Sequence, residues 1–170
     1  DNICRVFMCH DVLHSAHFQP EKRLEDFSTD AYIKVLHANT ITPMLWLKNL
    51  TPILTSKQSC KITIFTARVG SISDNELGGW YSYRSSKAAM NMLIKSAAVE
   101  LARRAKNIKL ISFHPGTTDT PLSKPFQKNV PEGKLFTSEF VAHNLLKIVA
   151  DTIIDGEASF LDWQGKNIPW

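Results

Sequence analysis

Short apolar runs alternate along the chain with longer stretches in which apolar residues recur every three or four positions. Four runs are typical of buried strands and lie at residues 3–9, 61–66, 108–113 and 158–161. Three stretches are typical of amphipathic helices and lie at residues 25–54, 83–106 and 137–154. This alternation predicts an α/β fold in which helices cover both faces of a parallel sheet.

Local signals indicate where the helices begin and bend. Ser28 or Thr29 is a candidate cap for the first helix, and Pro43 predicts a kink or a late first turn within it. Thr137 is a candidate cap for the last helix. The chain contains no internal repeat or linker, so residues 1–170 are predicted to belong to a single domain.

Composition narrows the class of protein. The 170 residues are 44% hydrophobic and 21% charged, which suits one globular domain. No run approaches the roughly 18 apolar residues of a membrane span, and charges interrupt any signal core near the start. We therefore expect a cytoplasmic protein without a membrane partner. The densest basic run, at residues 103–109, suits the end of a helix better than a nucleic-acid surface.

Neither the cysteines nor the histidines form a convincing metal motif. The three cysteines are odd in number and lack CxxC spacing, which argues against a disulfide framework and a structural zinc site. His10, His14 and His17 would share a face only if their segment were helical, and no second cluster accompanies them. We expect no metal site.

Glycine is absent from the first 69 residues. A glycine-rich phosphate-binding turn needs glycine wherever the backbone passes close to a pyrophosphate. The N-terminal part of this chain therefore contains no such turn.

Two residues at the start of the second long helix form a candidate catalytic pair. Tyr83 and Lys87 are four positions apart and so share a helical face, whereas Tyr81 and Lys87 are separated by about 240°. A neighbouring ammonium is expected to lower the pKa of a phenol and to let it exchange a proton with a substrate oxygen. The alternative is a surface pair worth a few tenths of a kcal/mol. A Ser85–Lys87 hydrolase site is disfavoured because no Gly-x-Ser-x-Gly motif accompanies it.

Three ordered motifs resemble the short-chain dehydrogenase/reductase family. The segment 83–89 resembles its Tyr-x-x-x-Lys element, the segment 114–120 resembles its Pro-Gly segment, and Asn39 matches its helix asparagine. Residues 68–75 and 165–170 further resemble the branch that includes the bacterial C-factor and carbonyl-reductase-like proteins. The resemblance covers essentially the whole chain.

The resemblance implies an NAD- or NADP-dependent oxidoreductase with a doubly wound Rossmann-type sheet, acting on a small carbonyl or alcohol. It implies that Tyr83 is the general acid/base, that Lys87 lowers its pKa and holds the nicotinamide ribose, and that Asn39 positions a relay water. The implied cofactor contacts, besides Tyr83 and Lys87, are Pro115, Gly116, Thr118 and Thr120. Family members commonly form dimers or tetramers through their long helices, so a homo-oligomer is expected. The apolar stripe Met90, Ile94, Ala97 and Leu101 is expected to be core or such a packing surface.

Two positions depart from the family pattern. The serine that helps to hold the substrate carbonyl is replaced by Thr66 or Ala67. Ser71 is the preferred substitute, with Ser73 as the second choice, and capping of a loop turn is an equal alternative for both. Asp11 follows the first strand, where the family has asparagine and glycine, and it is expected to place bulk and negative charge near the cofactor phosphates.

The family's glycine-rich front half has no counterpart here. Its first two strand–helix units occupy roughly 70 residues, so this chain is expected to begin at the fourth strand, with a Rossmann-type sheet that is incomplete at the N-terminus. We expect a partner or the absent segment to cover the resulting sheet edge. Dinucleotide binding by this chain alone is expected to be weak or absent, and the alternative function is a non-catalytic binding or assembly module.

Overall fold

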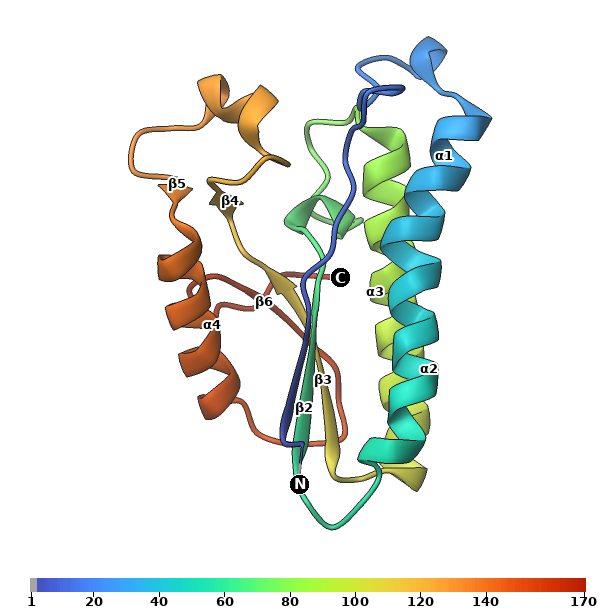
Figure 1. Cartoon of the computed structure of the whole chain (residues 1–170), viewed down its shortest axis with the longest axis vertical. Coiled ribbons are helices and arrows are strands. Elements are labelled where there is room, and N and C mark those ends of the chain that lie inside the picture. Colours follow the sequence, from blue (N-terminus) through green and yellow to red (C-terminus); the bar gives the residue numbers. More distant parts are fainter. Residues whose placement is uncertain (1–2) are drawn as a thin grey trace.

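A four-stranded parallel sheet lies between two layers of helices in the computed structural model, which describes residues 3–170 (Figure 1). The sheet order is β1-β2-β3-β6, and the strands are β1 (Arg5–Met8), β2 (Cys60–Phe65), β3 (Ile108–His114) and β6 (Ser159–Asp162). The helices are α1 (Thr29–Leu36), α2 (Thr42–Leu54), α3 (Tyr81–Arg104) and α4 (Ser138–Asp151). Helices α1, α2 and α3 cover one face and α4 covers the other, so the predicted α/β architecture is confirmed.

The central strand β3 shows why the strands consist of nearly continuous apolar runs. Ile108 and Leu110 belong to the core between the sheet and helices α2 and α3. Ile111 and Phe113 belong to the core on the side of α4. Successive side chains of a strand point to opposite faces, and both faces are buried here.

The predicted helix 25–54 is interrupted. A π-helical turn at His37–Ile41 separates α1 from α2, so the irregularity lies before Pro43 rather than at it. Pro43 occupies the first turn of α2, where the lack of an N–H is tolerated. Ser28 is confirmed as the cap, because its hydroxyl accepts from the Ala31 N–H. The predicted start of this helix at residue 25 is wrong, because Leu24–Asp26 forms a separate 3-10 helix and α1 begins at Thr29.

Contacts from remote residues set the ends of the other two helices. Helix α3 begins at Tyr81, two residues before the predicted start. Helix α4 has Thr137 as its cap, as predicted, but ends at Asp151 rather than at residue 154. The Lys61 ammonium, from β2, donates to the carbonyls of Val149 and Ala150 at that end. A lysine there satisfies carbonyls that have no helical partner and complements the helix dipole.

Short elements that the apolar pattern did not predict lie beyond the carboxyl ends of the strands. Two-residue strands β4 (Thr117–Thr118) and β5 (Leu135–Phe136) pair in parallel, and a 3-10 helix at Lys124–Asn129 lies between them in sequence. They are too short to show a period of their own, and β4 and the 3-10 helix contribute to one wall of the cavity described below.

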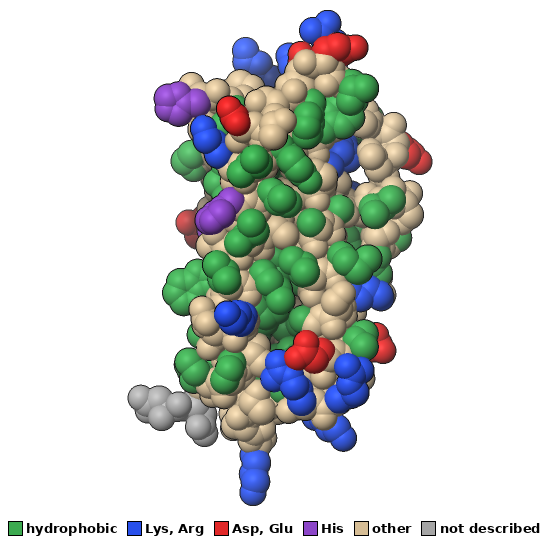
Figure 2. Space-filling view, turned by 90° about the vertical axis from the view of Figure 1, so that its right-hand side faces the viewer, with side chains coloured by type: hydrophobic (Ala, Val, Ile, Leu, Met, Phe, Trp, Pro, Cys, Tyr) green, Lys and Arg blue, Asp and Glu red, His purple; other side chains and the backbone are tan. Residues whose placement is uncertain are grey.

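The apolar stripe of α3 is mainly core. Met90, Ile94 and Leu101 are buried against the sheet, and Ala97 packs partly buried at the edge of the same cluster. Figure 2 shows hydrophobic side chains spread over one face of the molecule. The exposed large apolar side chains of α1, α2, α3 and the π-helical turn are Ile33, Ile41, Leu45, Trp46, Ile53, Met92 and Val99. Within residues 3–170, none of the helices combines the length and apolarity needed to cross a bilayer.

Two methionines of α3 test the position of the core. Met90 is fully buried and Met92 is 64% exposed. We predict that Met90→Ala lowers the free energy of unfolding by about 2–5 kcal/mol, because it removes a packed side chain and leaves a cavity. Met92→Ala, measured at a protein concentration at which the chain is monomeric, should change it by less than about 0.5 kcal/mol. Urea unfolding followed by circular dichroism measures both, and equal losses would contradict the packing described.

Candidate active site

A cavity of about 1090 Å³ lies at the carboxyl ends of the parallel strands. Asp11, Thr66 and His114 line it from the ends of β1, β2 and β3 or just beyond them, and Tyr83 lines it from the first turns of α3. The carboxyl edge of a parallel α/β sheet is the usual position for a ligand site. The cavity is therefore the candidate active site.

Tyr83, Lys87 and Asp11 form one buried cluster. The Tyr83 hydroxyl donates to Asp11 Oδ2 at 2.6 Å, and Lys87 Nζ lies 3.0 Å from Asp11 Oδ1. Lys87 Nζ also donates to the Phe65 carbonyl at 3.1 Å and lies 5.6 Å from the centre of the Tyr83 ring. The Lys87 side chain is 1% exposed and that of Asp11 15% exposed. The structure therefore brings the predicted pair together, with a carboxylate between the two polar groups.

In this arrangement the pKa of Tyr83 shifts in the direction opposite to the one expected. Burial, and then the negative charge and hydrogen bond of Asp11, raise the pKa of Tyr83 well above its ordinary value. Burial lowers the pKa of Lys87, whereas Asp11 acts in the opposite direction. The expectation that Lys87 lowers the pKa of Tyr83 is wrong for this arrangement, because the carboxylate contacts the phenol directly.

Asn39 holds the loop that carries Asp11. Its Oδ1 accepts from the Val12 N–H at 2.8 Å, and its Nδ2 donates to the Val12 carbonyl at 2.7 Å and to Ser86 Oγ at 3.2 Å. Asn39 is buried in the π-helical turn and does not line the cavity. The described contacts make it a tether between the loop after β1 and helix α3.

The N-terminus of α3 is fixed by residues that the sequence patterns did not reveal. The buried carboxylate of Glu21 accepts from both the N–H and the hydroxyl of Ser82. Trp80 has a left-handed backbone with φ of 52° and packs edge-on against Tyr83. A carboxylate at a helix N-terminus is favoured by the dipole, and a non-glycine residue at positive φ is typical of a constrained site. No local signal could have paired Glu21 with Ser82, because they are 61 positions apart.

Gly70 lets the loop after β2 approach α3 closely. A Cβ atom at Gly70 would lie 2.7 Å from the Cβ of Lys87 and 2.8 Å from its carbonyl carbon. These two atoms are fixed by the backbone of α3 and cannot move aside as the end of a side chain could. Any other residue at position 70 would therefore displace α3 where it carries Lys87.

The Pro-Gly segment lies in the cavity wall. Pro115, Gly116, Thr118 and Thr120 all line the cavity. Gly116 has φ of +73°, and a Cβ there would lie 2.6 Å from the Phe136 ring. The Thr120 hydroxyl lies 3.4 Å from the Thr118 carbonyl.

Two polar atoms in this part of the wall have no partner. Among the described residues, nothing forms a hydrogen bond with the buried Thr118 Oγ1 or His114 Nδ1. Burial lowers the pKa of His114 to about 4, so the ring is neutral at neutral pH. Buried polar atoms normally find a partner, and unpaired ones in a cavity wall indicate room for a polar ligand.

The structure does not bring the predicted serine into the cavity. Ser71 is buried, does not line the cavity, and accepts from the Asp74 N–H, which is the turn-capping role. Ser73 is exposed and donates to the Trp170 carbonyl.

Ala67 and Thr66 do line the cavity, but the Thr66 hydroxyl is bonded to Ser112 Oγ at 2.6 Å. The cavity wall next to Tyr83 thus has an apolar Ala67, one of the two residues at the place of the family's serine pair.

The three N-terminal histidines lie in an irregular loop rather than on a helix. His10 Nε2 lies 3.2 Å from the Ala38 carbonyl, and His14 Nε2 lies 3.1 Å from the Leu122 carbonyl. Within residues 3–170, no cluster of three histidine, cysteine or acidic residues could hold a metal ion.

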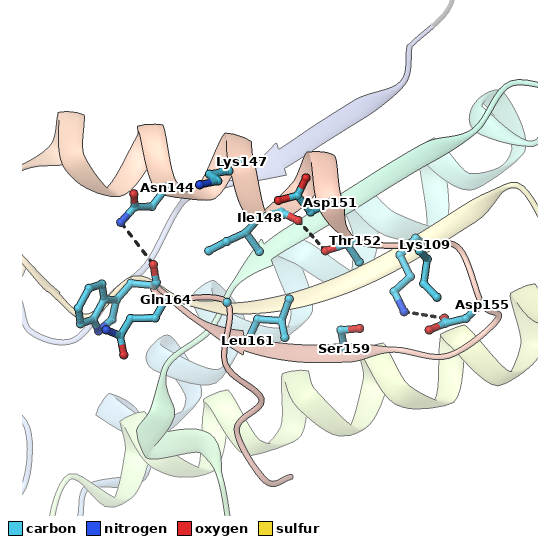
Figure 3. Close-up of a pocket in the computed structure, with 13 residues that line it drawn as sticks. Lys109, Asn144, Lys147, Ile148, Asp151, Thr152, Asp155, Ser159, Leu161 and Gln164 are labelled. Atoms are coloured by element: carbon cyan, nitrogen blue, oxygen red, sulfur yellow. Dashed lines mark hydrogen bonds and ion pairs between the residues drawn. The ribbon is translucent and has the colours of Figure 1, made fainter.

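A second cavity, of about 570 Å³, lies between α4 and β6 (Figure 3). Its buried cation is already satisfied, since Lys109 Nζ donates to Asp155 Oδ1 at 2.6 Å and to the Glu157 carbonyl at 2.8 Å. None of the predicted site residues lines it. The proposed chemistry therefore concerns the first cavity alone.

Comparison with known proteins identifies the family. The short chain dehydrogenase family model matches residues 11–131. The chain is 32% identical over 141 residues to 1-hydroxy-2-glutathionyl-2-methyl-3-butene dehydrogenase of Rhodococcus sp. strain AD45, covering 83% of this chain and 59% of that protein. It is 28% identical over 132 residues to C-signal of Myxococcus xanthus, covering 78% and 74%. The chain belongs to the short-chain dehydrogenase family, as the motifs indicated.

Solved structures confirm the Rossmann-type fold. The NADPH-bound carbonyl reductase from chicken fatty liver superposes with a TM-score of 0.83 at 22% identity, over 99% of this chain and 66% of that one. The carbonyl reductase Sniffer of D. melanogaster gives 0.81 at 20% identity, over 98% and 66%. The chain thus spans just under two thirds of these structures and 59% of the Rhodococcus dehydrogenase.

Some residues of the cavity wall could contact a polar ligand such as a nicotinamide dinucleotide. The cavity offers an unpaired Thr118 hydroxyl, the Gly116 backbone and the Asp11 carboxylate, whereas Lys87 is buried behind Asp11 and does not line it. Residues 3–69 contain no glycine, so none of the described segments before Gly70 can form a glycine-rich phosphate turn.

The tether formed by Asn39 can be tested by stability. We predict that Asn39→Ala lowers the free energy of unfolding by about 1–3 kcal/mol, because it leaves the Val12 N–H and carbonyl without partners. His37→Ala, at an exposed position of the same π-helical turn, is the matched control and should have little effect. Chemical unfolding measures both variants. Equal stability of Asn39→Ala and the wild type would show that the tether contributes nothing.

Proposed function

We propose that this chain carries the catalytic residues of an NAD- or NADP-dependent oxidoreductase that reduces a carbonyl or oxidises a secondary alcohol. The observation that carries the proposal is the Tyr83 hydroxyl in the wall of a large cavity, with the buried ammonium of Lys87 on the other side of Asp11. A buried phenol and a buried ammonium that share one carboxylate add little to the stability of the fold compared with well-packed apolar residues. Buried titratable groups of this kind concentrate at functional sites.

In the proposed reduction, Tyr83 donates its proton to the carbonyl oxygen of the substrate. A nicotinamide dinucleotide, when bound, supplies or accepts the hydride. The Lys87 ammonium stabilises negative charge that develops on the phenol and contributes to holding the ribose hydroxyls. Pro115, Gly116 and Thr118 are proposed to position the nicotinamide against the sheet edge, and Thr120 to hold the cofactor from the same segment.

The walls of the cavity favour a substrate with an apolar body. Leu13, Trp80, Leu122 and Phe126 line it near Tyr83, and Trp80 and Phe126 pack with their ring centres 5.1 Å apart. Apolar walls with a few convergent polar groups are typical of small-molecule sites. We propose a small carbonyl or alcohol substrate of this kind, in a cytoplasmic enzyme.

The second candidate is a binding or assembly module that lacks catalytic activity. It is favoured by one observation, which is that Asp11 already engages the polar atoms of both Tyr83 and Lys87.

The exposed apolar side chains of α2 and α3 support a homo-oligomer. Leu45 and Trp46 on α2, and Met92 and Val99 on α3, are each about half exposed or more. An apolar surface on two neighbouring helices is typical of an interface between copies of a chain. We propose that these helices pair across the interface.

Two tyrosines provide a matched test of the catalytic role. We predict that Tyr83→Phe lowers the rate of NAD(P)H-dependent carbonyl reduction by about 10²–10⁴-fold, since the proton donor is lost. Tyr81→Phe, at an exposed position two residues away, should keep the wild-type rate. Oxidation of the reduced cofactor is followed at 340 nm with the protein at its full natural length. Activity that survives Tyr83→Phe, or a wild type that neither binds cofactor nor reacts, would reject the oxidoreductase proposal.

A charge on α2 tests the proposed oligomer. We predict that Trp46→Glu converts the oligomer to monomers, because a carboxylate would be buried without a partner at an apolar interface. Lys48→Glu, at an exposed position on the same helix, should leave the molar mass unchanged. Static light scattering after gel filtration gives the mass, and a monomeric wild type would contradict the proposal.

A further inference from the structure

Asp11 contacts the polar atom of each residue in the proposed catalytic pair. One carboxylate oxygen accepts the Tyr83 hydroxyl at 2.6 Å, and the other lies 3.0 Å from Lys87 Nζ. The loop that carries Asp11 is held in place by the paired hydrogen bonds between Asn39 and Val12. The carboxylate is therefore fixed between phenol and ammonium by the fold.

The hydrogen bond between Tyr83 and Asp11 favours the protonated form of the phenol. A phenol has one hydrogen, and here that hydrogen is donated to Asp11. Loss of the Tyr83 proton would leave two negative oxygens in contact within a buried site. Two negative charges at such a short distance repel each other strongly, so the neutral phenol is the stable form beside Asp11.

Charge from other elements does not offset this effect. The Lys87 ammonium acts on the phenol from the far side of Asp11, which is the nearer charge. Three further titratable groups line the cavity: Cys9 from the loop after β1, His114 at the end of β3 and Arg84 on α3. Burial raises the pKa of the Cys9 thiol and lowers that of His114, so both favour their neutral forms. The Arg84 guanidinium donates to the carbonyls of Gly78 and Gly79.

We propose that Asp11 is a positioning residue that keeps the Tyr83 hydroxyl protonated, and so limits the amount of phenolate that proton removal from an alcohol requires. This inference rests on the proposed function of Tyr83. In the reduction, the Tyr83 O–H bond breaks, its proton forms the new O–H bond of the alcohol, and its electron pair stays on the phenol oxygen. The reduced nicotinamide supplies the hydride to the carbonyl carbon. The phenolate left beside Asp11 is unstable and regains a proton from solvent.

The effect of Asp11 can be measured without cofactor or substrate. The chain has three tyrosines, and tyrosinate absorbs near 295 nm, so subtracting the titration of Tyr83→Phe isolates Tyr83. We expect Tyr83 in the wild type to stay protonated until the fold is lost, as judged by circular dichroism. In Asp11→Asn it should ionise at a pH lower by about one unit or more, the usual effect of a neighbouring charge. Asp151→Asn, at an exposed position, is the control and should match the wild type.

A double variant covers the case in which Asp11→Asn leaves the buried ammonium unpaired and fails to fold. Asp11→Asn with Lys87→Met removes both charges, and Tyr83 should still ionise at a lower pH than in the wild type, because the contacting carboxylate is the larger influence. An unchanged Tyr83 titration in whichever of the two variants folds would overturn the inference. Because the titration involves no turnover, it separates this outcome from a failure of the oxidoreductase proposal, which shows as lack of activity.

Discussion

The structure of this site depends on one ion pair, between the ammonium of Lys87 and the carboxylate of Asp11. A lysine that is 1% exposed cannot remain charged without a nearby anion and hydrogen-bond acceptors. Asp11 supplies the anion and the Phe65 carbonyl supplies an acceptor. The strand ends, the loop after β1 and the start of α3 must therefore keep their relative positions for the cluster to persist.

Several separate features of the fold maintain these positions. Asn39, in a π-helical turn, holds the loop that carries Asp11, and Gly70 allows that part of α3 which carries Lys87 to approach the loop after β2. Glu21 caps the first turn of α3 from a remote segment. π-Helical turns and positive-φ residues such as Trp80 are less favourable than regular backbone, and they persist here because surrounding contacts fix them. The π-helical turn and Trp80 thus contact the loop and the helix that carry the Asp11–Tyr83–Lys87 cluster.

Much of the fold was predictable from the sequence because both faces of the sheet are buried. The apolar runs that mark β2 and β3 follow directly from that burial, and the helical period of α3 identified its buried face. The pairing of Tyr83 with Lys87 followed from helix geometry alone. Contacts between residues far apart in sequence were not predictable in the same way. The position of Asp11 between the pair, which reversed the expected pKa of Tyr83, depends on a loop without periodicity, and Ser71 proved to cap a turn.

We propose that the residues of the cavity wall, with Lys87 buried behind Asp11, hold a nicotinamide cofactor beside Tyr83. Titration of NADPH fluorescence with the protein at its full natural length tests it most directly, with the wild type compared with Lys87→Met and with the exposed control Lys95→Met. We predict saturable binding by the wild type and by Lys95→Met, and a loss of affinity of about tenfold or more in Lys87→Met, from removal of a charge-assisted contact. Absence of saturable binding by the wild type, or equal affinity of all three proteins, would contradict it.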